Sequence, residues 1–196
     1  MKSRHALPAV LLALAAAGAH GCTTGPPPPR ATATLVPCFV EGVRAPARCT
    51  TVRVFEDRAR GAGRTIDLRV VVIPALASAP APDPIFFLAG GPGQAATQIA
   101  GFSLAAADRL HDKHDFVFVD QRGTGASNGL FCEAAADDAP LAERFDSTFD
   151  PDAVTRCRDD QDADLRLYTT SLAMDDLDDV RAALGYSKIN LWGTSY

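Results

Sequence analysis

IFFLAGGPG at residues 85–93 and FVFVDQRGTGAS at residues 116–127 decide the fold. Each stretch opens with four residues that are all apolar, which is typical of a strand buried on both faces of a parallel sheet. Each strand then runs into a loop rich in glycine. The two stretches therefore predict an α/β domain with a mostly parallel sheet and helices on both of its faces.

The flanking segments supply the rest of the predicted sheet and two helices. Residues 50–55 alternate between β-branched and polar side chains, and with residues 65–73 they predict a β-hairpin. Residues 189–192 predict a last strand. Residues 100–110 predict one helix, and residues 171–184 predict a second that carries a single apolar stripe.

The N-terminus has the three parts of an export signal. A positively charged start is followed by a 12-residue apolar stretch at 6–17 and by small residues before Cys22. We interpret residues 1–21 as a signal peptide; the alternative is a buried amphipathic helix. The sequence AHGC resembles a bacterial lipobox, so Cys22 is either lipidated or simply follows a cleavage site. Residues 22–37, which include four consecutive prolines, are interpreted as the anchor and a stiff tether.

Composition excludes several classes of protein. The chain has 196 residues, is 47% apolar and carries a formal net charge of −5. Removal of residues 1–21 takes away two basic residues and no acidic one, so the mature charge becomes −7. A nucleic-acid binder would show a basic face, which this sequence lacks. A lipid anchor would hold so acidic a protein through its acyl chains rather than through headgroup attraction.

The cysteines predict a disulfide framework. Without Cys22 the count is four, an even number, as expected in an oxidising compartment. Four cysteines allow three pairings, of which Cys38–Cys49 and Cys132–Cys157 are the local ones; four free thiols are the alternative. The second pair would staple short helices within the polar segment 126–170. No metal site is expected, because the cysteine spacing lacks zinc-binding patterns and the acidic cluster at 159–164 lacks the residues of a calcium loop.

The last residues carry a candidate nucleophile. Gly193-Thr194-Ser195-Tyr196 supplies four fifths of the G-x-S-x-G pattern, in which a sharp turn after a strand exposes the serine hydroxyl. The glycines at 90–93 would let backbone N–H groups approach a developing oxyanion. The alternatives for this loop are an ordinary turn and a phosphate cradle, but no lysine follows it and Pro92 has no N–H.

Three motifs in this order resemble one family. AGGPG at 89–93, DQRGTGAS at 120–127 and LWGTSY at 191–196 are similar to the prolyl aminopeptidase and tripeptidyl aminopeptidase branch of the α/β-hydrolases. The resemblance covers residues 50–196, and Ala89 stands where that family often has histidine. It implies the N-terminal part of an α/β-hydrolase fold.

The resemblance also implies roles for individual residues. Ser195 would be the nucleophile, and the backbone N–H groups of Gly91 and Tyr196 would bind the oxyanion. Asp120 and Arg122 would brace the neighbouring loop.

The remaining triad members are not found in the expected place. In α/β-hydrolases the acid and the histidine follow the serine, whereas all four histidines here precede Ser195. We expect His111 and His114 to be surface residues. Residues 38–196 are therefore expected to form an incomplete α/β-hydrolase domain, truncated at the nucleophile elbow and inactive on its own.

These observations lead to a functional hypothesis. The sequence predicts an exported serine hydrolase of the bacterial cell envelope, either a periplasm-facing lipoprotein or a secreted protein, which most resembles an aminopeptidase. Its partners would be a peptide or a small ester or amide substrate and, through the anchor, the membrane; no cofactor and no nucleic acid are expected. The alternatives are an exported carboxylesterase on the same fold and a non-catalytic envelope lipoprotein.

Overall fold

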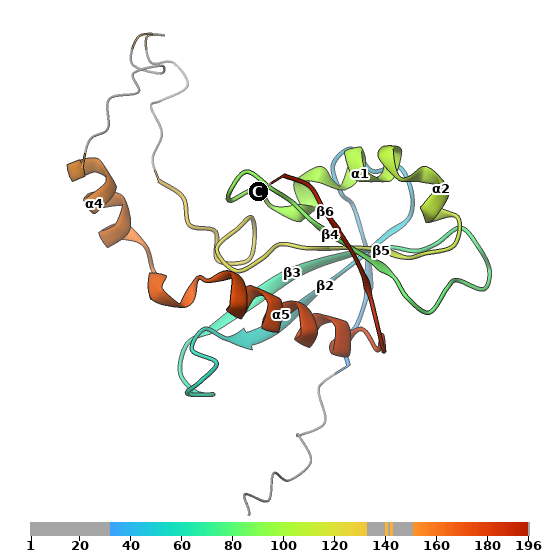
Figure 1. Ribbon diagram of the computed structural model, residues 1–196, viewed down its shortest axis with the longest axis horizontal. Coiled ribbons are helices and arrows are strands. Elements are labelled where there is room, and N and C mark those ends of the chain that lie inside the picture. The colour runs from blue at the N-terminus through green and yellow to red at the C-terminus, as the bar shows by residue number, and fades with distance from the viewer. Residues whose placement is uncertain (1–31, 133–139, 141, 143–150, 196) are drawn as a thin grey trace, which may run out of the picture.

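The computed structural model describes residues 32–132, 140, 142 and 151–195. The predicted signal peptide, Cys22, the proline run and Tyr196 lie outside these residues. Six strands form one sheet (Figure 1). They are β1 (Val36–Cys38), β2 (Ala47–Phe55), β3 (Thr65–Ile73), β4 (Ile85–Leu88), β5 (Phe116–Val119) and β6 (Asn190–Gly193).

The sheet is mixed, with the order β1-β2-β3-β5-β4-β6. The β1–β2, β2–β3 and β3–β5 pairs are antiparallel, and the β4–β5 and β4–β6 pairs are parallel. The prediction of a mostly parallel sheet was therefore wrong. The cause is the N-terminal hairpin, which joins the same sheet by pairing β3 with the buried strand β5.

Helices cover both faces of this sheet. The described helices are α1 (Ala100–Ala106), α2 (Asp108–His111), α4 (Pro151–Asp160) and α5 (Thr170–Ala183), with short 3-10 helices η1 (Ala96–Ile99) and η2 (Leu165–Leu167). Residues of η1 and α1 pack with Phe87, Phe116 and Phe118 in one core cluster. Residues of α5 pack with Phe86, Val117 and Val119 in a second cluster on the other face. α4 has no buried residue and stands away from the sheet (Figure 1).

The N-terminal boundary of the packed domain lies ahead of residue 38. The N–H of Ala33 donates to the carbonyl of Ala183 at the end of α5, at 2.9 Å. Leu35 packs against the core cluster beneath α5. Residues of the expected tether therefore already belong to the folded domain, at the end of α5 that is remote from Thr170.

The structure contains both disulfides that the cysteine spacing predicts. Cys38–Cys49 joins β1 to β2, and Cys132–Cys157 joins the segment after β5 to α4. Two disulfides in one domain are consistent with an extracytoplasmic location. Among the described helices, none is long and apolar enough to cross a bilayer.

Candidate active site

Ser195 lies two residues after the end of β6, at the carboxyl end of the parallel part of the sheet. Its φ is +63°, in the left-handed region that residues other than glycine seldom adopt. The side chain is exposed, and the preceding residue is fixed because the N–H of Thr194 donates to the carbonyl of Leu88 at 3.2 Å. A left-handed serine close after a strand end is one feature that the predicted nucleophile elbow requires.

The glycine loop after β4 is a closed turn. The N–H of Gln94 donates to the carbonyl of Gly90 at 3.1 Å. Gly91 has a φ of +121°, and a Cβ there would lie 2.9 Å from the Gln94 nitrogen. The turn thus requires glycine at position 91, and no backbone carbonyl among the described residues accepts from the N–H of Gly91 or Gly93.

One pocket of about 430 Å³ brings Ser195 together with this loop. It lies where the carboxyl ends of β4, β5 and β6 meet the first turn of α5, and in Figure 1 the C-terminal end lies beside the loop after β4. Gly91 itself is not part of the wall, and Tyr196 lies outside the described residues. The lining residues are Leu88, Ala89, Gly90, Pro92, Gly93, Gln94, Gln121, Thr124, Thr170, Met174, Gly193, Thr194 and Ser195.

Asp120 braces two of the loops that form this pocket. Its buried carboxylate accepts hydrogen bonds from the N–H of Thr97 at 2.9 Å and from the Thr97 hydroxyl at 3.1 Å. It also accepts one from the N–H of Ala126, at 3.2 Å. Thr97 lies in η1, directly after the glycine loop, so Asp120 ties that loop to the loop after β5. The two motifs are therefore held by one carboxylate.

Arg122 acts as a second brace, in a fully buried ion pair. Its Nε donates to Asp176 Oδ2 at 2.7 Å and its Nη2 to Asp176 Oδ1 at 2.8 Å. Its Nη1 donates to the carbonyls of Glu56 and Leu167. Because every donor of this planar group points at a partner in the protein, Arg122 joins the loop after β5 to α5 and to the β2–β3 connection.

Sequence reasoning missed Asp176 as the partner of Arg122. It lies within the acidic first half of α5, and a carboxylate near a helix start is readily explained by the helix dipole. Its position on the inward face is the signal that could have identified it, because Asp176 is adjacent to Leu177 and three residues after Ala173 on the apolar stripe. An acid on that stripe requires a buried cation.

The two described histidines lie at the other end of the sheet. His111 is buried, so the expectation that it is a surface residue was wrong. Its Nε2 lies 2.9 Å from the carbonyl oxygen of Pro74, and its ring packs against Phe116. His114 Nδ1 lies 2.8 Å from the carbonyl oxygen of Asp83, before β4 begins. Neither is positioned to act on a serine at the carboxyl ends of the strands.

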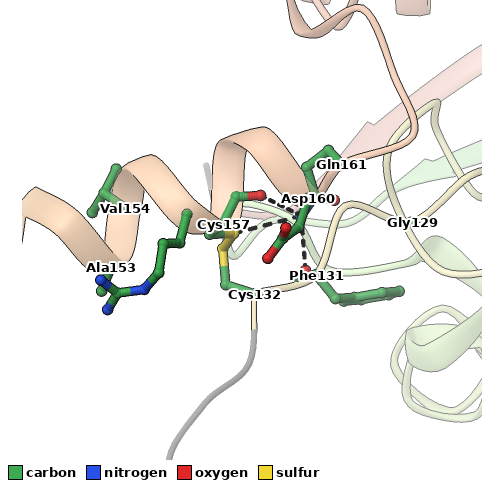
Figure 2. Close-up of a pocket in the computed structure, with 9 residues that line it drawn as sticks. Gly129, Phe131, Cys132, Ala153, Val154, Cys157, Asp160 and Gln161 are labelled. Carbon is green, nitrogen blue, oxygen red and sulfur yellow. Dashed lines mark hydrogen bonds between the residues drawn. A yellow bond between two sulfur atoms is a disulfide. The ribbon is translucent and has the colours of Figure 1, made fainter.

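A larger cavity lies at the Cys132–Cys157 disulfide. It measures about 650 Å³ and lies between α4 and the chain before Cys132, as Figure 2 shows. Gln161 closes one side, since its Nε2 donates to the carbonyls of Cys157 and Phe131. None of the motif residues lines this cavity, so it is separate from the candidate active site.

No family model matches the chain, and no curated protein matches it. Among the described residues no group of three or more histidine, cysteine, aspartate or glutamate side chains could hold a metal ion. The geometry around Ser195 is thus the basis for assigning a function.

Proposed function

We propose that this chain carries the nucleophile of an exported serine hydrolase of the α/β-hydrolase type, most similar to an aminopeptidase. The observation that supports it is the meeting of Ser195, in its left-handed conformation, with the glycine loop in one pocket. The parallel strands β5, β4 and β6 provide the scaffold for these loops. Ligands of α/β sheets bind in this position, outside the carboxyl ends of the strands.

The proposed chemistry is acyl transfer. The Ser195 hydroxyl oxygen attacks the substrate carbonyl while a general base takes its proton, and amide donors of the glycine loop and of Tyr196 stabilise the oxyanion. The C–N bond then breaks, the amine leaves with that proton, and water hydrolyses the ester on Ser195. We propose that neither His111 nor His114 is this general base, because both lie at the other end of the sheet.

The first alternative is a carboxylesterase with the same nucleophile. The pocket beside Ser195 is lined by apolar and uncharged polar residues. An aminopeptidase needs a carboxylate for the substrate's ammonium group, whereas an esterase does not. This lining is the observation that favours the alternative.

The test is to label the full chain encoded by the gene with a fluorophosphonate probe and to measure turnover of amino-acid amides and simple esters. We expect labelling at Ser195, and we expect Ser195→Ala to lose both labelling and turnover, by about 10⁶-fold for the latter. Ser187→Ala is the matched control, since Ser187 is an exposed serine ahead of β6.

The outcomes separate the proposals. Turnover of amides supports the aminopeptidase and turnover of esters alone supports the carboxylesterase. If Ser195 is unreactive, or if Ser195→Ala retains turnover, the hydrolase proposal is wrong and a non-catalytic envelope protein takes its place.

We also propose that Cys22 anchors the protein to the membrane as a lipoprotein. Metabolic labelling with a fatty acid should tag the wild type and leave Cys22→Ala untagged. Equal labelling of both would contradict the anchor, and a released, untagged wild type would indicate simple cleavage and secretion.

A further inference from the structure

The pocket beside Ser195 has an apolar floor and a polar rim. Leu88 at the end of β4 and Met174 on α5 both pack against the core cluster beneath α5, so they form the floor where the pocket meets the core. The rim consists of the neutral polar side chains Gln94, Gln121, Thr124 and Thr170.

Met174 is the floor residue that α5 contributes. Thr170 and Met174 lie four residues apart, one above the other on the same face of the helix, and both line the pocket. Met174 is partly buried, whereas Thr170 in the first turn is exposed. A group that passes Thr170 from solvent therefore meets Met174 at the bottom of the pocket.

The charged groups nearest to this wall have partners elsewhere. Asp120 is bound to Thr97 and Ala126, and Arg122 to Asp176. Asp175, next to Met174, lies 3.9 Å from Arg58. A charged group placed on the pocket floor would lose its hydration without gaining a counter-ion.

We propose that this pocket receives the side chain of the substrate's acyl group, that it selects uncharged side chains, and that Met174 sets their maximum size. This inference rests on the proposed function, since it assigns the acyl group to the space next to Ser195. The substrate class is an acyl group with an uncharged, small to medium-sized side chain. For an aminopeptidase the pocket holds the side chain of the N-terminal residue, and for an esterase it holds the hydrocarbon part of the carboxylic acid.

The volume agrees with this size class. The pocket of about 430 Å³ is near the small end of the range of about 300–1,000 Å³ that is usual for ligand sites. Methionine is flexible and fills irregular apolar gaps, so a change in its length changes the floor directly.

The test compares substrates on one enzyme preparation, using the full chain encoded by the gene. Alanine and leucine p-nitroanilides give one ratio of kcat/KM, and p-nitrophenyl hexanoate and acetate give a second ratio for an esterase. Such ratios do not depend on the fraction of enzyme that is folded. Met174→Ala should change both kcat/KM ratios in favour of the substrate with the larger acyl group, and Met174→Phe should change them in favour of the smaller one. The expected shift is about tenfold or more, as one methylene in an apolar pocket changes kcat/KM by about 10–200-fold.

Two controls isolate the effect. Leu172→Ala removes an apolar side chain from the same helix outside the pocket wall and should leave the ratio within about twofold. Glutamine and glutamate p-nitroanilides, which are nearly identical in shape, test the charge preference, and the glutamine substrate should be at least about tenfold better.

The results distinguish this inference from the function on which it rests. If Ser195 is labelled and substrates are turned over, but both Met174 variants leave the ratios unchanged or move them in the same direction, the assignment of Met174 is wrong and the hydrolase proposal stands. A glutamate substrate as good as glutamine would overturn the charge preference. If Ser195 is unreactive in the wild type, both proposals are wrong.

Discussion

Gly125 lies where the loop after β5 passes the Asp120 carboxylate. Its φ is +48°, and a Cβ there would lie 2.6 Å from the Cβ of Ala95 as well as against the Asp120 side chain. We expect Gly125→Ala to lower the free energy of unfolding by about 2–5 kcal/mol, because left-handed strain costs about 1–2 kcal/mol and overpacking about 1–3 kcal/mol.

Gly61→Ala is the matched control for urea unfolding of this variant. Gly61 has a φ of +57°, and nothing lies within 4 Å of a Cβ built there. Gly61→Ala should lower the free energy of unfolding only by the backbone strain, about 1–2 kcal/mol. Equal losses in the two variants would show that the contact with Asp120 and Ala95 contributes nothing.

Ionisation of Tyr168 makes the stability of the protein depend on pH in the alkaline range. Burial and a 2.9 Å hydrogen bond to Glu56 raise its pKa to about 12. A raised pKa means that the folded state holds the proton more tightly than the unfolded state, whose pKa is about 10. Its contribution to stability is therefore fully present below pH 10 and is lost as the pH rises through about 12.

Absorbance at 295 nm provides the measurement for Tyr168. The titration curve of the wild type minus that of Tyr168→Phe should show a single ionisation near pH 12. A difference curve centred near pH 10 would contradict the burial and the bond to Glu56.

At the scale of elements, the buried ion pair between Arg122 and Asp176 fixes α5 against the loop after β5. Asp176→Ala leaves the buried Arg122 guanidinium without a carboxylate and should cost about 3–5 kcal/mol. In Arg122→Ala the Asp176 carboxylate keeps Arg58, whose Nη1 lies 3.0 Å from its Oδ1, so this variant should cost less. Replacement of both by apolar residues, Arg122→Met with Asp176→Leu, should recover most of the loss caused by Asp176→Ala. Chemical denaturation measures the free energy of unfolding of all three variants.

The exposed pair Arg53–Asp67 is the control for this comparison. It has similar two-point geometry, at 2.6 and 2.9 Å, but lies in solvent. Arg53→Ala should cost only about 0–1 kcal/mol. A loss as large as that of Asp176→Ala would mean that burial is not the deciding factor.

The elements that sequence predicts well are those whose pattern is local. β4 and β5 were predicted at their observed bounds because each is a run of four apolar residues, short enough for a strand, that ends at a glycine-rich loop. The strand β1 was missed, since it has only three residues, two of them exposed, and Pro37 lies inside it. Strand direction was also misjudged, because nothing in residues 65–73 specifies that β3 pairs with β5.

The same distinction holds for the candidate site. Ser195 and the glycine loop are candidates that motifs indicate, because acyl-transfer chemistry requires particular residues at a fixed spacing. Asp120 is indicated by the family resemblance as a loop brace, and its bonds to Thr97 and Ala126 agree with that role. The contributions of Thr97, Met174 and Asp176 depend on how α5 and η1 pack, which no local pattern specifies.

At the scale of the whole molecule, β6 is one of the two edge strands of the described sheet, and β1 is the other. Among the described strands β6 pairs only with β4, and its four residues are exposed. Leu191 is 58% exposed, and Trp192, which stacks on Phe87, is 39% exposed. An apolar strand with free N–H and C=O groups is a template for pairing with another chain.

We therefore expect the 196-residue chain to self-associate through β6. A lysine on an edge strand opposes pairing, so Leu191→Lys should shift the protein from oligomers to monomers in sedimentation velocity at equal concentration. Phe102→Lys is the matched control: Phe102 is 71% exposed on α1, away from any strand edge, and its replacement should leave the association unchanged. If both variants dissociate the oligomer, exposed apolar surface in general drives association. If neither does, β6 is not the contact and its edge is protected in solution.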